Sequence, residues 1–161
     1  MIRIGHGMDV HRFSDDPERR LVLAGVVIEG APGLEGHSDA DVATHALCDA
    51  VLGAAGLGDL GRHFPDADPA FAGAASTDLL ARCVSLARAE GLVVSSGDVT
   101  IVAETPKLAA YFDAMAARLT EVVGAPVSVK ATTTEGLGAI GRSEGIAAHA
   151  VVLLTGPAGH P

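Results

Sequence analysis

The residue types best suited to chemistry gather in one stretch, residues 36–69, with the sequence GHSDADVATHALCDAVLGAAGLGDLGRHFPDADP. It holds three of the seven histidines of the chain and six aspartates. Asp41, His45 and Asp49 fall at i, i+4 and i+8, so they share one face if this stretch is helical. An ordinary solvated helix face carries Lys, Arg and Glu, whereas this one carries small acids and an imidazole. We interpret this face as part of a functional site.

A metal ion is the first ligand that these residues suggest. Asp9 and His11 stand at i and i+2, so both side chains point to the same face if their segment is a strand. With His45 they would give a tetrahedral cation three ligands and leave its fourth position to water or substrate. Mixed nitrogen and oxygen ligands favour Zn²⁺, with Mn²⁺, Co²⁺ or Ni²⁺ as alternatives. The competing interpretation is three unrelated polar residues, because Asp-x-His alone is a weak signal.

A second cluster lies in the segment KATTTEGLGAIGR, residues 130–142. The hydroxyl and backbone N–H groups of Thr132–Thr134 would form an anion cradle at the end of a strand. Glu135 could hold a hard divalent ion that bridges phosphate oxygens, and Arg142 could clamp a phosphate with two hydrogen bonds. A threonine turn that caps a short helix, beside a surface arginine, explains the same residues without a ligand.

Two further groups of residues give weaker indications of ligand binding. The connection Ala103–Lys107 exposes backbone groups that could read the edge of a planar base, although a plain strand-to-helix connection explains it as well. His37 and Ser38, with 59–61 and 64–68, could bind the hydroxyl groups of a polyol. Polar caps and turns are the alternative interpretation of these residues.

The elements that must position these residues follow from periodicity and from turn residues. Strands are predicted at 2–10, 21–28, 92–103, 127–131 and 146–154, with a hairpin corner at Ala24-Gly25. Helices are predicted from near residue 39, with Ser38 as N-cap, to Gly53 or Gly56, and over 77–90 and 107–123. The glycine-rich segment 56–61 is predicted to be a tight loop. We expect one α/β sandwich, a mixed four- to five-stranded sheet with helices on one face. Since these helices cannot cover both faces, the other face should pack against copies of the same chain.

Composition narrows the class of protein. The 161 residues fit one domain over 1–156, with 157–161 expected to be a disordered tail. A net charge of −9 argues against nucleic-acid binding, and a phosphate ligand would need bound cations to offset it. No apolar run reaches membrane-spanning length and no signal peptide is evident, so we expect a cytoplasmic protein. Cys48 and Cys83 are isolated and fit a reduced compartment; Cys48 is expected to be a buried thiol rather than a metal ligand.

Taken together, these segments resemble the 2-C-methyl-D-erythritol 2,4-cyclodiphosphate synthase family of the non-mevalonate route to isoprenoid precursors. The matching segments are GMDVHRF (7–13), the whole of 36–69, DVTIVAETPKL (98–108) and VKATTTEGLGAIGRSEGIA (129–147). They span nearly the whole chain, and the long central motif is highly specific. Three positions depart from the family pattern: Glu104 replaces a common Gln, Gly136 a frequent Lys and Ala139 a frequent Phe.

The resemblance implies a homotrimer packed through its sheets, with active sites between subunits. It implies zinc on Asp9, His11 and His45, and Mg²⁺ or Mn²⁺ on Glu135. His37 and Thr133 would stabilise the transferring phosphoryl group. The methylerythritol and cytidine portions of the substrate would contact Asp9, Val10, His11, His37, Ser38, Asp59, Leu60, Gly61, Phe64, Pro65, Asp66, Ala67, Asp68, Ala103, Glu104, Thr105, Pro106, Lys107, Leu108, Ala109, Thr132, Thr133, Thr134, Glu135, Ala139 and Arg142.

The reaction that the resemblance implies closes 4-diphosphocytidyl-2-C-methyl-D-erythritol 2-phosphate into the cyclic diphosphate and expels CMP. No catalytic triad is needed, because the nucleophile is a phosphate oxygen of the substrate itself. Two alternatives remain open from the residues alone. One is a zinc-dependent phosphodiesterase or nucleotide hydrolase, and the other is a non-catalytic trimeric protein that binds an isoprenoid phosphate.

Overall fold

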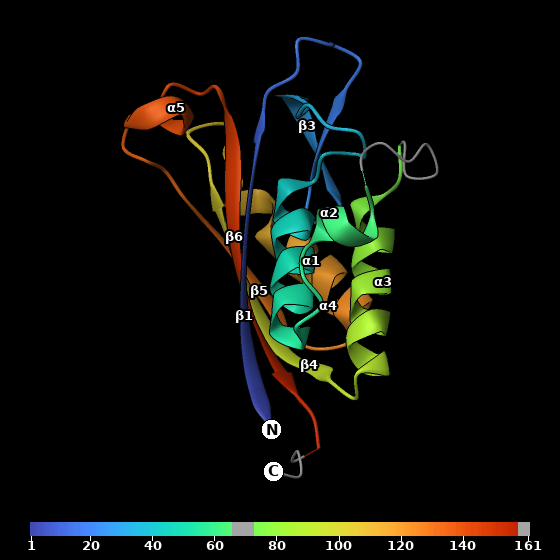
Figure 1. The fold of residues 1–161 in the computed structure, drawn as a ribbon. Helices are drawn as coiled ribbons and strands as arrows, with labels where there is room; N and C mark the ends of the chain where they lie inside the picture. The colour runs from blue at the N-terminus through green and yellow to red at the C-terminus, as the bar shows by residue number, and fades with distance from the viewer. Residues whose placement is uncertain (66–72, 158–161) are drawn as a thin grey trace.

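A computed structural model describes residues 1–65 and 73–157 of the chain. A four-stranded sheet carries helices on one face, and a two-stranded hairpin lies on the same side of the sheet, above the helices in Figure 1. The predicted site residues Asp66, Ala67 and Asp68, and residues 158–161 of the predicted tail, lie outside the described residues. The elements are β1 (Ile2–Arg12), β2 (Arg20–Leu23), β3 (Val26–Pro32), α1 (Val42–Ala55), α2 (Leu60–His63), α3 (Ser76–Ala89), β4 (Val93–Val102), a 3₁₀ turn (Ala109–Tyr111), α4 (Phe112–Val123), β5 (Val127–Thr132), α5 (Gly138–Gly141) and β6 (Gly145–Thr155).

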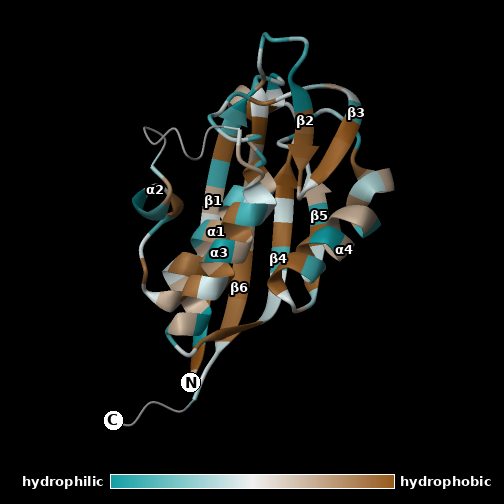
Figure 2. Cartoon of the chain, turned by 90° about the vertical axis from the view of Figure 1, so that its right-hand side faces the viewer, coloured by the Kyte–Doolittle hydropathy of each residue, from teal (hydrophilic) through white to brown (hydrophobic). Residues whose placement is uncertain are grey.

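The main sheet has the strand order β1-β6-β4-β5. Strands β4 and β5 are parallel, and the other two pairs are antiparallel. Figure 2 shows that β6, in the interior of the sheet, is hydrophobic along most of its length. The predicted mixed sheet with helices on one face is therefore confirmed. The predicted hairpin corner is confirmed too: Ala24 and Gly25 have φ of 52° and 72°, the left-handed pair that a tight hairpin turn requires.

Two glycines let α1 lie directly on the backbone of β1. A Cβ atom on Gly5 would stand 1.9 Å from the carbonyl oxygen of Ala50, and one on Gly7 would stand 1.9 Å from that of Ala46. Any larger residue would push the helix off the strand. This close approach places His45 of α1 beside the residues that follow Gly7 in β1.

Helix α1 begins later than the sequence predicted. Ala40 has a left-handed φ of 55°, so the helix starts at Val42 and its N-cap is Asp41, not Ser38. The carboxylate of Asp41 accepts hydrogen bonds from the backbone N–H groups of Thr44, Ala24 and Gly25. Asp41 is fully buried, so the prediction that it shares a functional face with His45 is wrong. These hydrogen bonds tie the helix to the hairpin turn instead.

Two other boundaries also differ from the prediction. Residues 60 and 61, the end of the predicted loop 56–61, instead begin α2, because the side chain of Asp59 caps this helix by accepting from the N–H of Arg62 at 2.9 Å. The helix predicted from residue 107 begins as a 3₁₀ turn at Ala109 and becomes α4 only at Phe112. The chain first turns over 104–106 and buries Leu108 in the core.

The face of the sheet opposite the helices carries large apolar side chains. Alternate residues of β1 point outward there, and Ile2, Ile4 and Val10 are 69%, 72% and 52% exposed. Val151 of β6 is 45% exposed on the same face. Both cysteines are buried, unpaired thiols. Among the described residues, no helix has the length and apolar character needed to cross a bilayer.

Candidate metal centre and substrate pocket

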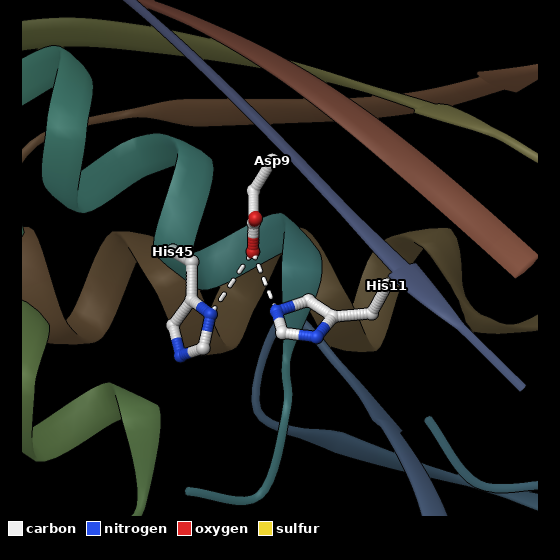
Figure 3. A group of neighbouring side chains, drawn as sticks. All are labelled: Asp9, His11 and His45. Atoms are coloured by element: carbon white, nitrogen blue, oxygen red, sulfur yellow. Dashed lines mark hydrogen bonds and ion pairs between the residues drawn. The ribbon is translucent and has the colours of Figure 1, made fainter. Parts of the chain in front are cut away.

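Asp9, His11 and His45 meet at one point between β1 and α1 (Figure 3). The Oδ2 atom of Asp9 lies 2.9 Å from Nε2 of His11 and 3.0 Å from Nδ1 of His45. One ligand atom from each residue lies within 4.8 Å of the others. The alternation of β1 brings Asp9 and His11 to the helix side of the sheet, as their spacing predicted.

The outward nitrogen of each histidine is held by the protein. Nδ1 of His11 contacts the carbonyl oxygen of Glu35, which can only accept, so this nitrogen carries the hydrogen. Nε2 of His45 lies 2.8 Å from Oγ of Ser76. Because Ser76 donates its only hydroxyl hydrogen to Asp39, it must accept from His45.

It follows that both inward nitrogens offer lone pairs to a carboxylate that also has only lone pairs. Two acceptors that each lie at hydrogen-bond distance from a third are repelled by it unless a proton or a cation lies between them. Histidines whose second nitrogen is fixed by a protein acceptor are typical of metal ligands. The donor set, two imidazole nitrogens and one carboxylate, therefore fits a divalent cation.

The charges of the group follow from the same contacts. Burial opposes ionisation of Asp9, but its contacts with His11 and His45 prevail and hold the pKa of its carboxyl well below the ordinary value. The contact with Asp9 is the main cause that raises the pKa of His11, against the effect of burial. Asp9 is thus an anion over the whole physiological range, as a metal ligand must be.

The three residues stand on the wall of a cavity of about 280 Å³. Its lining comes from β1, the loop before α1, α1 itself, α2 and α3. The lining residues are Asp9, His11, Gly36, His37, Ser38, His45, Asp49, Leu60, Gly61, Phe64 and Leu79. Charged and polar side chains share this lining with the apolar residues Leu60, Phe64 and Leu79.

The second predicted cluster lies elsewhere in the chain. Residues 103–109 follow β4, and residues 132–135 end β5 and continue beyond it, so the parallel pairing of these strands brings both segments together. Backbone N–H of Ala103 donates to the carbonyl of Thr132, and Glu104 contacts Thr134. Among the described residues, the lining of the cavity includes no member of either segment. The two predicted clusters thus lie apart in one chain.

Comparison with known proteins assigns the family. Residues 2–155 match the model of the YgbB family. The 2-C-methyl-D-erythritol 2,4-cyclodiphosphate synthase of Symbiobacterium thermophilum is 58% identical over 156 residues, which cover 95% of this chain and 98% of that protein. The chain belongs to the 2-C-methyl-D-erythritol 2,4-cyclodiphosphate synthase family.

Solved structures agree with this cyclodiphosphate synthase fold. The bifunctional IspDF of Campylobacter jejuni matches with a TM-score of 0.92 and 43% identity over 97% of this chain. The chain spans 42% of the length of that bifunctional protein. A CDP complex of IspF from Plasmodium falciparum matches with a TM-score of 0.82 and 31% identity, and covers 96% of both chains.

Within this cyclodiphosphate synthase chain, the structure adds Ser76 and Asp39, which the sequence did not reveal, and it places the predicted Asp49 in the lining of the cavity. Ser76 and Asp39 fix the orientation of His45, and Asp49 lines the cavity and accepts from the N–H of Leu60 at 2.7 Å. Ser76 is the first residue of α3, where a serine is common for reasons of local structure. Only its contacts with Asp39 and His45 show that it has a further role. Asp49 was predicted from its place one turn after His45.

Proposed function

We propose that this chain cyclises 4-diphosphocytidyl-2-C-methyl-D-erythritol 2-phosphate to 2-C-methyl-D-erythritol 2,4-cyclodiphosphate and releases CMP. The observation that carries the proposal is the convergence of three lone-pair donors on the wall of a cavity, in a chain of this family. Residues 1–156 would act as one cyclodiphosphate synthase domain, in the cytoplasm.

The chemistry requires positioning and neutralisation of charge more than proton transfer. The attacking oxygen belongs to the 2-phosphate of the substrate, so the step is a ring closure. Well-oriented intramolecular attack can lower a barrier by roughly 7–11 kcal/mol. The cavity that His37, Ser38 and Phe64 help to line would fold the substrate into the attacking conformation.

Asp9, His11 and His45 would hold Zn²⁺, and Glu135 would hold Mg²⁺ or Mn²⁺ on the diphosphate. Such cations supply Lewis-acid polarisation of phosphate oxygens when bound. The chain carries a net charge of −9. The cations held by these four residues would offset this charge locally, so that an acidic protein could bind a polyanion. His37 and Thr133 would stabilise the transferring phosphoryl group, and Arg142 would contact phosphate.

The cytidine portion would bind at 103–109 and 132–134, through the backbone rather than the side chains of Ala103 and Leu108, which are buried. Since these segments do not line the cavity of their own chain, we propose that they complete the cavity of a neighbouring subunit. The exposed apolar face of the sheet is the surface that a homotrimer would bury.

This homotrimer predicts a definite solution mass. Multi-angle light scattering should give three times the mass of one chain at micromolar concentration, because exposed residues such as Ile4 and Val10 need to be covered. A monomer of normal activity would contradict active sites shared between subunits.

Ser76→Ala should weaken metal binding without unfolding the protein. Without its hydroxyl, Nε2 of His45 loses its closest acceptor and keeps the longer contact with Oγ of Ser38 at 3.1 Å, and loss of such a partner typically lowers metal affinity about 10–100-fold. Competition with a chromogenic zinc chelator measures the change. Ser85→Ala is the matched control, because this hydroxyl lies on the same helix but donates to the carbonyl of Ala81; equal affinities for the two variants would contradict the assignment.

The reaction itself is tested by mass spectrometry of the products formed from the diphosphocytidyl substrate with Zn²⁺ and Mg²⁺ in isotopically labelled water. Cyclisation yields CMP and a cyclic diphosphate that contain no oxygen from the solvent. A zinc-dependent hydrolase would incorporate solvent oxygen, and a non-catalytic binding protein would leave the substrate intact. Either of the latter results would overturn the proposal.

A further inference from the structure

The side chain of Glu104 joins the two segments of the second predicted cluster, residues 103–109 and 132–135. Glu104 follows β4, and its Oε1 atom accepts from the N–H of Thr134 at 2.9 Å, from the hydroxyl of Thr134 at 3.2 Å and from the N–H of Gly136 at 3.2 Å. One carboxylate oxygen thus receives three hydrogen bonds from the segment that follows β5. Glu104 is one of the positions that depart from the family pattern, where Gln is common.

The geometry at Thr134 and Gly136 is that of an anion-binding nest. Backbone N–H groups two residues apart point to one acceptor, an arrangement that binds phosphate and other anions in many proteins. Here the anion is a carboxylate of the same chain. The hydrogen bond from Gly136 is the main cause that holds the pKa of Glu104 below its ordinary value, so this carboxylate is ionised at neutral pH.

The segment needs such a restraint. Glu135 and Gly136 have φ of 54° and 79°, and the left-handed region is unfavourable for a residue with a Cβ atom such as Glu135. Residues held in this way persist where surrounding contacts fix them. The hydroxyl of Thr133 also donates to the carboxylate of Glu135 at 3.1 Å, so the conformation of this turn sets the position of both side chains.

We propose that Glu104 is a positioning residue, which fills the nest with its carboxylate and so holds Thr133 and Glu135 in place for the diphosphate and its cation. The inference rests on the proposed function for the role of those two residues. It makes Glu104 a part of the site despite its negative charge, because that charge is neutralised by the N–H groups of the turn. It also means that Thr134 N–H and Gly136 N–H are not available to the substrate.

The opposite role would be competition, in which the carboxylate blocks a phosphate subsite. The two roles predict opposite changes when Glu104 is shortened. Removal of a positioning residue weakens ligand binding, whereas removal of a competitor strengthens it. The variants Glu104→Ala and Glu104→Gln therefore decide between them, because the glutamine retains an oxygen acceptor at the same place.

The experiment is calorimetric titration of CDP into the zinc-loaded protein with Mg²⁺. We expect Glu104→Ala to bind CDP about tenfold or more weakly, as loss of hydrogen bonds to a charged group implies. Glu104→Gln should restore affinity to within about threefold of the parent chain. Glu121→Ala, which removes an exposed glutamate paired with Arg118 on α4, is the control for net charge. Tighter binding by Glu104→Ala, or no change, would overturn the proposal.

Amide hydrogen exchange gives a readout that does not depend on nucleotide binding. In Glu104→Ala the amides of Thr134 and Gly136 should exchange at least about tenfold faster, and in Glu104→Gln they should stay protected. If the parent chain binds no CDP, the proposed function fails, but the exchange experiment still tests whether Glu104 holds the turn in place. Unchanged protection in Glu104→Ala would show that the turn holds its shape without Glu104, and the inference would be wrong.

Discussion

Replacing His45 with alanine is expected to lower kcat/KM for cyclisation by about a thousandfold or more while the fold survives. His45 is the only one of the three candidate ligands that comes from a helix, and its Nδ1 atom closes the group against Asp9 at 3.0 Å. Lewis-acid stabilisation is worth several kcal/mol, and each 1.36 kcal/mol corresponds to about a factor of ten in rate. With two ligands left, the cation would bind weakly and without its fixed orientation.

Three measurements on His45→Ala separate loss of metal from loss of structure. Elemental analysis should show less than one zinc per chain, and circular dichroism should show an unchanged helix content. Light scattering should show the same mass as the parent chain. Turnover near the parent rate by this variant, in buffer treated with a chelator, would refute the role of the metal.

Gly7→Ala is expected to destabilise the protein by about 3 kcal/mol, the upper end of the usual cost of overpacking. The new methyl group would lie 1.9 Å from the carbonyl oxygen of Ala46, and backbone cannot rotate away as a side chain can. Helix α1 would have to move off β1, which also separates His45 from Asp9. Urea unfolding measures the loss of stability, and zinc affinity should fall with it.

The same helix provides the control. Gly53 lies inside α1, and an added Cβ atom there meets nothing within 4 Å. Gly53→Ala should therefore stabilise the protein by about 0.5–1 kcal/mol through helix propensity. If both variants unfolded at the same urea concentration, the close packing of α1 on β1 would not be what limits residue size at Gly7.

Local periodicity was sufficient to predict the parts of the site that depend on one element. The i, i+2 spacing of Asp9 and His11 requires only that β1 be a strand, and the placement of His45 requires only that the stretch after Ser38 be a helix. Their convergence was a hypothesis until the packing of α1 on β1 was known. It depends on Gly5 and Gly7, and no local pattern shows that a helix packs directly on these two residues.

Roles that depend on contacts between distant elements could not be predicted. Asp41 has the spacing of a functional residue, but its carboxylate is buried and accepts hydrogen bonds from two N–H groups in the turn of the β2–β3 hairpin. Ser76 looks like the first residue of a helix, and only its contact with His45 gives it a further role. Glu104 differs from the family pattern in the sequence, but its three donors come from a distant segment and are seen only in the structure.

The most direct test of this account is a crystal structure of the zinc-loaded protein with data collected on both sides of the zinc absorption edge. We predict one anomalous peak in each chain, within about 2.0–2.2 Å of Nε2 of His11, Nδ1 of His45 and a carboxylate oxygen of Asp9, with the fourth position taken by solvent or phosphate. A peak at another place, or a fourth protein side chain that closes the coordination sphere, would contradict it.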